Sequence, residues 1–285
     1  MLHMRDVRKA FGRTVAVDGL SLRVHPGEVF GLLGPNGAGK TTTISMAIGL
    51  VRPDAGTVEL EGHGPPTDGK VRRMIGVAPQ SLALYDQLTA EENLAFFGRL
   101  YDLKGRGLAD RVQAVLGAVG LSPRRRDRVG GFSGGMKRRM NLAVAMLHDP
   151  PMLLLDEPTA GVDPQSRNNI LELVRDLRAQ GRTVVYTTHY MEEAQRLCDR
   201  VAVMDQGRLL ALGTVHELVE QHGGRSVVSL ERGDRVEHVQ TDDPLREISR
   251  ALAADAPGPA ISGVRIERPS LESVFLTLTG RSLRD

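Results

Sequence analysis

Residues 29–41 read Val-Phe-Gly-Leu-Leu-Gly-Pro-Asn-Gly-Ala-Gly-Lys-Thr, and this stretch decides the fold. The first five residues form an apolar run typical of a buried strand, and apolar residues recur at helical spacing from Thr42 to Leu50. The turn between them fits the pattern G-x4-GK(S/T). Its glycines let successive backbone N–H groups point inward around a polyphosphate, beside the partial positive charge of a helix start. The order of strand, turn and helix therefore predicts a phosphate-binding loop in an α/β fold.

Within this loop, the two residues at its end have distinct expected roles. Lys40 would reach the β- and γ-phosphate oxygens, and the hydroxyl of Thr41 would bind Mg²⁺. The residues that we expect to bind nucleotide here are Gly34, Pro35, Asn36, Gly37, Ala38, Gly39, Lys40, Thr41 and Thr42.

A second apolar run, Met152 to Leu155, ends in the two acidic residues Asp156 and Glu157. A buried parallel strand that delivers an aspartate at its carboxyl edge places it beside the phosphate loop, where such sheets bind ligands. We expect Asp156 to hold Mg²⁺ and Glu157 to orient or deprotonate the attacking water. The alternative is that the two carboxylates only cap the turn before Pro158.

A serine and two glycines, Ser133, Gly134 and Gly135, precede a predicted helix. A serine hydroxyl and free backbone amides at a helix start form a second possible phosphate site. Taken alone, the segment is equally typical of an ordinary helix N-cap.

Composition narrows the class of protein. The chain has 285 residues, a formal charge of +2, 41% hydrophobic residues and 25% charged residues, as expected of a globular protein. A net charge so close to zero gives no electrostatic argument for nucleic acid as the main partner. The longest apolar run, Leu142 to Leu147, is far shorter than the ~20 residues of a membrane span. With a single cysteine and no secretion-signal pattern at the start, we expect a cytosolic chain.

The order of the predicted elements suggests two domains. Strands are expected up to about residue 78, helices from about 89 to 147, and two parallel strands joined by a crossover helix at 164–180. A hairpin is expected over 201–212. Shorter strands and helices follow, so we predict a boundary between domains 1–215 and 216–285.

Further along the chain, Gln80, the segment Ala160-Gly161-Val162-Asp163 and His189 complete a familiar order of motifs. With the phosphate loop, Ser-Gly-Gly-Met and Asp-Glu, they follow the order of the ATP-binding-cassette (ABC) ATPases. The chain resembles the nucleotide-binding subunit of an ABC transporter, and closely the daunorubicin-resistance-like subgroup that serves ABC-2 type exporters of drugs and antibiotics. The resemblance covers residues 1 to about 215 and, weakly, the remainder. It implies a P-loop NTPase fold with an antiparallel β subdomain, a helical subdomain and a small α+β C-terminal accessory domain.

The resemblance also implies roles for single residues in an ATPase that uses ATP and Mg²⁺. Phe11 would stack on adenine, although it could instead pack in the core, and Gln80 would contact Mg²⁺ and water. Asp163 would lie along a dimer seam, and His189 would hydrogen-bond the γ-phosphate. The proposed sets are Glu157 and His189 for catalysis, Thr41, Gln80 and Asp156 for the metal, and Phe11, Gln80, Ser133, Gly134, Gly135 and Asp163 for ATP beside the loop residues.

The implied partners are a second copy of the chain and a separate membrane permease. Ser133 would grip the nucleotide of the other subunit in a head-to-tail homodimer, on the inner face of the cell membrane. The expected permease-docking surface includes Leu82, Leu84, Tyr85, Phe96 and Phe97, which could equally belong to the core of the helical subdomain. The rival hypothesis is an ABC-type ATPase that acts on nucleic acid or ribosomes. The single P-loop and the absence of a long heptad array disfavour it.

Other signals are weaker. The basic runs 124–128 and 137–139 are expected to form a solvated or paired surface, and Cys198 a buried apolar group on a helix. An apolar stripe of Leu271, Val274, Phe275 and Leu278 predicts a helix that covers the sheet of the accessory unit or contacts another subunit.

Overall fold

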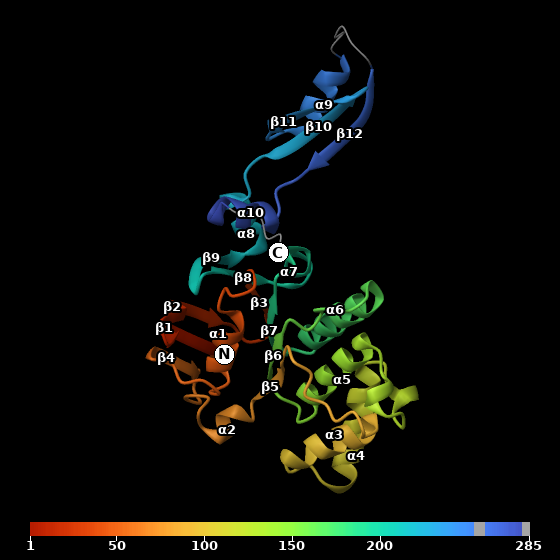
Figure 1. Cartoon of the computed structure of the whole chain (residues 1–285). Coiled ribbons are helices and arrows are strands. Elements are labelled where there is room, and N and C mark those ends of the chain that lie inside the picture. Colours follow the sequence, from red (N-terminus) through yellow and green to blue (C-terminus); the bar gives the residue numbers. More distant parts are fainter. Residues whose placement is uncertain (254–259, 281–285) are drawn as a thin grey trace. The chain divides into compact units, whose positions relative to one another are not determined.

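A computed structural model describes residues 1–253 and 260–280 (Figure 1). The chain divides into two compact units, Met1–Gly213 and a second one that begins at Thr214. The elements of the first unit are β1 (Leu2–Phe11), β2 (Thr14–Val24), β3 (Val29–Leu33), α1 (Lys40–Ala47), β4 (Ala55–Leu60), α2 (Gly69–Arg72), β5 (Ile75–Ala78), α3 (Ala90–Leu100), α4 (Gly105–Ala118), α5 (Gly134–Met146), β6 (Met152–Asp156), α6 (Pro164–Ala179), β7 (Thr183–Thr188), α7 (Met191–Leu197), β8 (Arg200–Asp205) and β9 (Arg208–Thr214).

The central sheet has six strands in the order β5-β6-β7-β3-β8-β9. The pairs from β5 to β8 are parallel, with Leu33 opposite Thr188, Asp156 opposite Thr187 and Ala78 opposite Leu155. The carboxyl ends of β3, β5, β6 and β7 therefore meet at one edge of the sheet. This edge carries the phosphate loop, the Gln80 segment, the Asp156–Glu157 pair and His189, which come from distant parts of the sequence.

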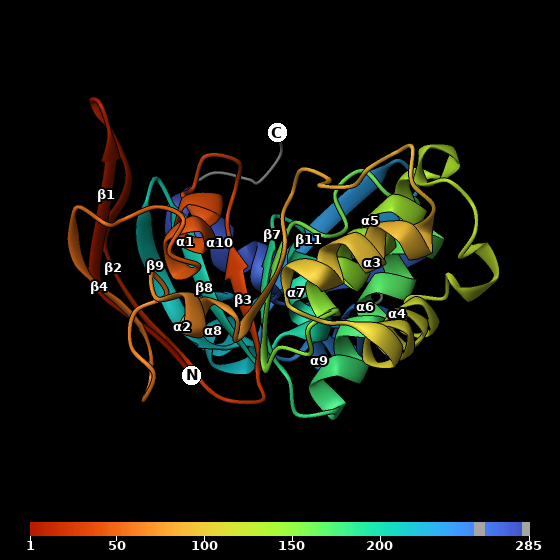
Figure 2. The same cartoon turned by 90° about the horizontal axis from the view of Figure 1, so that it is seen from below.

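Two apolar cores flank the central sheet, because its strands alternate their side chains between two buried faces. On β6, Leu153 and Leu155 belong to the core under the helices, and Leu154 belongs to the core under the antiparallel sheet. Figure 2 shows α3–α7 on one side of β3 and β7, and β1, β2, β4 and α1 on the other. Each fully buried leucine stabilises this arrangement by about 2 kcal/mol.

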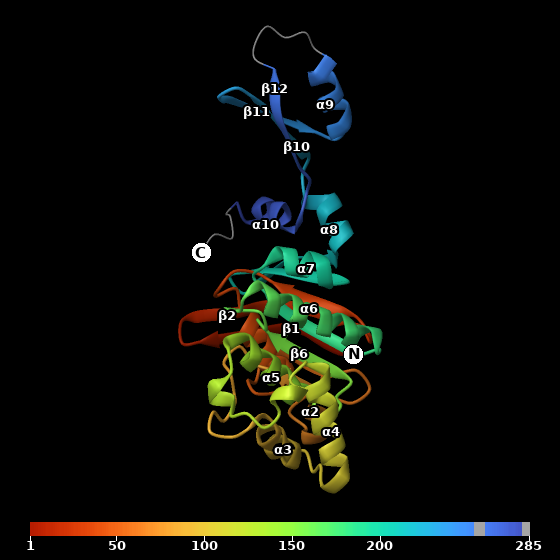
Figure 3. The same ribbon diagram turned by 90° about the vertical axis from the view of Figure 1, so that its right-hand side faces the viewer.

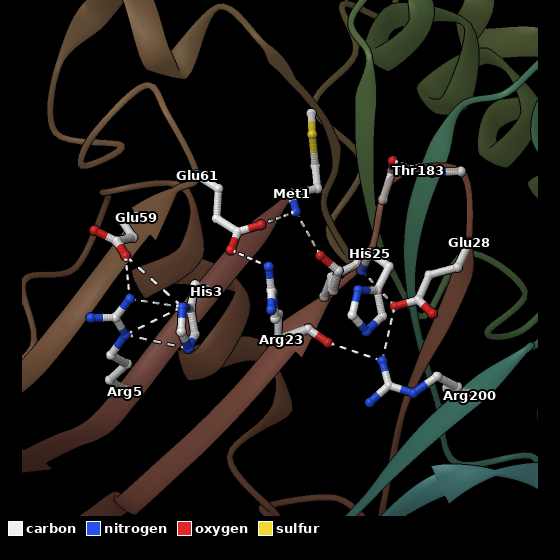
Figure 4. Close-up of polar contacts among 12 residues, drawn as sticks. Met1, His3, Arg5, Arg23, His25, Glu28, Glu59, Glu61, Thr183 and Arg200 are labelled. Carbon is white, nitrogen blue, oxygen red and sulfur yellow. Dashed lines mark hydrogen bonds and ion pairs between the residues drawn. The ribbon is translucent and has the colours of Figure 1, made fainter.

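The antiparallel sheet, in the order β2-β1-β4, is joined to the central sheet by polar contacts drawn in Figure 4. The Met1 ammonium donates to Val24 O and to Glu61 Oε2, at 2.8 and 3.0 Å. Arg200 of β8 donates to Arg23 O and Glu28 Oε1, and Gly27 N donates to Thr183 Oγ1 of β7. The contacts of Met1 lie at the end of the antiparallel sheet, whereas those of Arg200 and Gly27 fix the chain where it passes from one sheet into the other.

The helical subdomain is α3, α4 and α5, with 3₁₀ turns at Ser122–Arg124 and Val129–Gly131. The pattern Thr89-Ala90-Glu91-Glu92 predicts a capping box at the start of α3, and it is present: Thr89 Oγ1 accepts from Glu92 N, and Glu92 Oε2 accepts from Thr89 N. The expectation for the helix after the phosphate loop was wrong at both ends. It begins at Lys40 rather than Thr42, because the loop residues form its first turn, and it ends at Ala47 because Gly49 has φ +69°.

The second unit contains α8 (Val215–His222), β10 (Ser226–Arg232), β11 (Arg235–Thr241), α9 (Pro244–Ala253), β12 (Ile261–Glu267) and α10 (Leu271–Thr279). Its sheet has the order β11-β10-β12, and α9 packs against β10 and β12 (Figure 3). Of the two alternatives for the last helix, the one in which it covers this sheet is wrong: α10 packs against α8, with Leu271, Val274 and Phe275 buried. Contact with another subunit stays a prediction. The predicted Pro/Gly loop falls at 254–259, outside the described residues.

Candidate functional site

The phosphate loop is shaped by Gly39 and Lys40. Gly39 has φ +98°, and a Cβ there would lie 2.4 Å from Ala16 O of β2, so a side chain is excluded on both grounds. Lys40 Nζ donates to Gly34 O at 2.8 Å and to Pro35 O at 3.0 Å. No side chain caps the start of α1, so its first amides remain available to an anion. The Thr41 side chain next to them is exposed.

Three side chains at the carboxyl edge of the central sheet converge on the carboxylate of Glu157. Lys40 Nζ lies 3.1 Å from its Oε1, and Gln80 Nε2 donates to its Oε2 at 3.3 Å. His189 Nδ1 lies 3.3 Å from the same Oε2. The structure thus brings together four of the predicted site residues, each from the end of a different strand. Lys40 and Glu157 are both buried, which strengthens their ion pair by keeping water away.

Asp156 is held by a residue that the sequence analysis missed. Thr187 Oγ1 donates to Asp156 Oδ1 at 2.6 Å and accepts from Glu157 N at 2.9 Å. One hydroxyl therefore orients both acidic residues. The available signal was the position of Thr187 at the end of a strand, two residues before His189.

Arg138 is a second missed residue. It lies on α5 within one of the basic runs that we expected to face solvent or to be paired, and it donates to Gln80 O. Burial lowers the pKa of Arg138, while the charges of Glu157 and Asp156 act in the opposite direction. Asn141, one turn later, donates to Pro79 O at 3.0 Å. The helix after Ser133 is thus bonded to the segment that carries Gln80.

Ser133 and Gly134 lie exposed at the start of α5, where Ser133 Oγ accepts from Met136 N at 3.3 Å. Asp163 caps the neighbouring α6 by accepting from Ser166 N. The pKa of Asp163 is lowered, first by hydrogen bonding with the Ser166 side chain and then by this backbone bond. The two helix starts are close, because a Cβ on Gly135 would lie 2.0 Å from Ser166 Oγ. Ser133 and Asp163 therefore share one surface.

Phe11 is 52% exposed at the end of β1, which excludes the alternative that it packs in the core. Lys9 Nζ lies 5.5 Å from its ring centroid. In the expected docking surface, Leu82, Tyr85 and Phe96 are exposed, whereas Leu84 and Phe97 pack against the helical core. Tyr85 and Phe96 form an edge-to-face pair with centroids 4.9 Å apart. Leu84 and Phe97 thus belong to the core of the helical subdomain, and docking of a permease at the three exposed side chains stays a prediction.

Several other basic residues of the runs 124–128 and 137–139 are engaged with acidic partners or backbone. Lys137 pairs with Asp86, Arg124 with Asp127, and Arg139 donates to Val119 O. Cys198 is half-buried and follows the last residue of α7 rather than lying inside a helix. Burial raises the pKa of its thiol, so it behaves as an apolar group.

This set of groups can bind and cleave a nucleoside triphosphate. The loop supplies amides and an ammonium for the phosphates, and a carboxylate stands where it can accept a proton from water. Among the described residues, no helix is both long and apolar enough to cross a membrane.

Comparisons with known proteins agree with the site. Residues 17–160 match the family model described as ABC transporter. Over its full length the chain is 43% identical to the linearmycin resistance ATP-binding protein of Bacillus subtilis (strain 168), all of which is covered. It is 44% identical to Nod factor export ATP-binding protein I of Cupriavidus metallidurans, with 100% of this chain and 99% of that protein covered.

Solved structures give the same answer. An ATP-binding subunit of an ABC transporter aligns with a TM-score of 0.70 and 32% identity, over 78% of this chain and 93% of that one. A dimeric ATP-binding cassette in a post-hydrolysis state, bound to ADP and Pi, aligns with a TM-score of 0.69 and 26% identity, over 75% and 98%. The chain therefore belongs to the ABC transporter family, as an ATP-binding subunit with ATPase activity.

Proposed function

We propose that this chain powers the export of a small molecule, such as a drug or antibiotic, through a separate membrane permease. Two relatives that it matches along its length are named for antibiotic resistance and for export. These names favour transport over the rival role on nucleic acid or ribosomes. In this proposal Met1–Gly213 is the nucleotide-binding domain, and the unit from Thr214 is an accessory domain.

The convergence of Lys40, Gln80 and His189 on Glu157 is the observation that supports hydrolysis at this edge. Glu157 takes a proton from the attacking water, and Lys40 and His189 hold the γ-phosphate. Phe11 offers an exposed ring face to adenine. Gln80 orients the water. Its segment is bonded to α5, so a movement of the permease that shifts this segment changes the position of Gln80 in the site.

Mg²⁺ fits the donors present at this edge. The Thr41 hydroxyl, the Asp156 carboxylate and the Gln80 amide are hard oxygen ligands of the kind that Mg²⁺ prefers. Thr187 fixes the orientation of Asp156 for this role. When bound, the ion would neutralise charge on the β- and γ-phosphates.

A head-to-tail homodimer would complete each site. Ser133 and Gly134 are exposed at the start of α5, and a helix start attracts negative charge. Facing the γ-phosphate of a second copy, this segment makes ATP part of the interface. Hydrolysis then removes the contact and lets the halves separate.

The permease would bind at the inner face of the membrane, on the exposed part of the docking surface at Leu82, Tyr85 and Phe96. This surface follows directly on Gln80. A movement of this surface by the permease would therefore move Gln80, and with it the hydrogen bond from Gln80 to Glu157.

A mixing experiment tests the shared site. Lys40→Ala and Ser133→Arg variants should each hydrolyse little or no ATP alone, because each lacks one half of every site. Mixed at equal concentration, they should regain part of the wild-type rate, since a mixed dimer retains one site with an intact loop and an intact serine segment. A mixture that stays inactive, beside an active wild type, would contradict the head-to-tail arrangement.

A second experiment separates transport from the rival. The Glu157→Gln chain, which should bind ATP without hydrolysing it, is purified with ATP from the membranes of cells that express it. Recovery with a polytopic membrane protein supports the permease proposal. Recovery with RNA or DNA instead would replace the permease proposal with the rival role on nucleic acid or ribosomes.

A further inference from the structure

Behind the catalytic edge lies a buried carboxylate, Glu193 of α7, which is 3% exposed. Its Oε2 accepts hydrogen bonds from Thr159 Oγ1 at 2.9 Å, Tyr186 OH at 2.9 Å and Thr188 Oγ1 at 3.0 Å. Burial, followed by the Glu193 charge, raises the pKa of Tyr186, which keeps its phenol protonated as a donor. Three donors to one oxygen are typical of an ionised carboxylate, which offers only acceptors.

The charge of Glu193 has a nearby counterpart. Arg167 Nε of α6 lies 3.4 Å from Glu193 Oε1, and its guanidinium lies 4.7 Å from the ring centroid of Tyr190. A buried carboxylate without such partners would be costly. The cluster is therefore a paired and hydrogen-bonded unit with a fixed geometry.

Two of the three hydroxyls come from the segments that hold the proposed catalytic groups. Thr159 lies two residues after Glu157, and Ala160 N donates back to Glu157 O at 3.1 Å. Thr188 immediately precedes His189, and its Oγ1 also accepts from Tyr190 N at 2.9 Å. The third donor, Tyr186, lies inside β7 and belongs to neither segment.

The backbone of Glu157 needs such support. Its φ is +46°, a left-handed conformation that residues with a side chain rarely adopt. Such a conformation is strained and persists only when its surroundings hold it. Thr187 bonds the amide of Glu157 on one side, and Thr159 anchors the turn that follows on the other.

We propose that Glu193 is a positioning residue for hydrolysis, which holds the Glu157 and His189 segments at a fixed separation through the hydroxyls of Thr159 and Thr188. This inference rests on the proposed roles of Glu157 and His189. The phosphate loop meets this cluster through the backbone of Thr188, whose O accepts from Gly34 N at 3.4 Å. Substitutions of the side-chain hydroxyls leave that backbone bond in place, so they should affect the rate of hydrolysis more than the affinity for ATP.

The test removes one hydroxyl at a time, because a change at buried Glu193 itself could prevent folding. Thr159→Val and Thr188→Val delete the donor at nearly constant size, and Thr159→Ser and Thr188→Ser keep it. Tyr186→Phe is the control that deletes the third donor to the same oxygen. Its hydroxyl also lies 3.4 Å from Thr159 Oγ1, so the variant removes that contact but keeps the bonds of Thr159 and Thr188 to Glu193. For each full-length variant, kcat and KM for Mg-ATP and the melting temperature are measured.

Both valine variants should lower kcat about tenfold or more, because small displacements of catalytic groups have effects up to ~100-fold. Their KM should stay within about twofold of wild type, and the serine variants should restore kcat. Tyr186→Phe should lower the melting temperature as the valine variants do, while it keeps kcat within about twofold of wild type.

Two results would overturn the proposal: valine variants that lose stability but keep kcat, or a Tyr186→Phe variant that loses kcat to the same extent. Either would make Glu193 a part of the scaffold only. A wild-type chain without ATPase activity, or a Glu157→Gln variant with unchanged turnover, would instead contradict the proposed function on which the inference depends.

Discussion

Glu157 shows how much of the site is decided by single residues. Its carboxylate contacts Lys40, Gln80 and His189, and its amide is bonded by Thr187. The first three partners were among the predicted site residues: Lys40 from the pattern of the phosphate loop, and Gln80 and His189 from the resemblance to the ABC ATPases. Thr187 and Arg138 could not be predicted in the same way, since their roles depend on strand register and helix packing across the sheet.

His148 provides a test at the residue scale, through the pH dependence of stability. Burial lowers the pKa of His148 to about 4, and the ring stacks on Tyr101 with centroids 3.8 Å apart. The unfolded chain binds a proton at this residue below pH ~6.5, whereas the folded chain does so only near pH 4. Between these values the unfolded state holds more protons, so stability should fall as the pH falls.

A His148→Phe variant, which keeps a ring beside Tyr101, should lose this part of the pH dependence. Urea unfolding of both proteins at pH about 7.5 and about 5 measures it. The loss of unfolding free energy between the two pH values should be smaller in the variant. Equal losses would show that His148 titrates alike in the folded and unfolded states.

At the scale of elements, local sequence patterns account for several helix starts but not for the contacts of the helices. The capping boxes of α3 and α8 and the serine cap of α10 follow from short-range patterns. The apolar stripe of α10 correctly indicated a buried face but gave no indication of its partner, which is α8 rather than the sheet. An apolar stripe in the sequence indicates that one face of a helix is buried. Which element packs against that face depends on the path of the whole chain.

The cap of α3 gives a prediction at this scale. Thr89→Ala removes the one hydroxyl that both accepts from Glu92 N and donates to Glu92 Oε2. The variant should lose about 1 kcal/mol of unfolding free energy, and Thr89→Ser should retain most of it. Denaturant titration of the three proteins decides the matter. A loss in Thr89→Ser as large as in Thr89→Ala would show that the hydroxyl is not what stabilises α3.

At the scale of the whole molecule, the two units should unfold as separate cooperative transitions. The candidate site lies entirely within Met1–Gly213. A ligand that binds only the folded state stabilises it, by about 2.7 kcal/mol at a hundredfold excess over its dissociation constant. In calorimetry of the Glu157→Gln protein, Mg-ATP should raise the melting temperature of one transition and leave the other unchanged.

The same calorimetric scan offers an internal assignment. Thr89→Ala should lower only the transition that Mg-ATP raises, and Thr214→Ala, which removes the cap of α8, should lower only the other. A single transition that responds to all three changes would show that the two units unfold together.

The position of β3 has a consequence for how the chain is made. It leaves the ribosome early, yet its neighbours in the finished sheet are β7 and β8, which are synthesised some 150 residues later. Until then the apolar Val29–Leu33 segment has no strand to pair with, and the phosphate loop has no support. A prematurely terminated product that ends before Thr183 should therefore be a substrate for chaperones and proteases rather than a partly active enzyme.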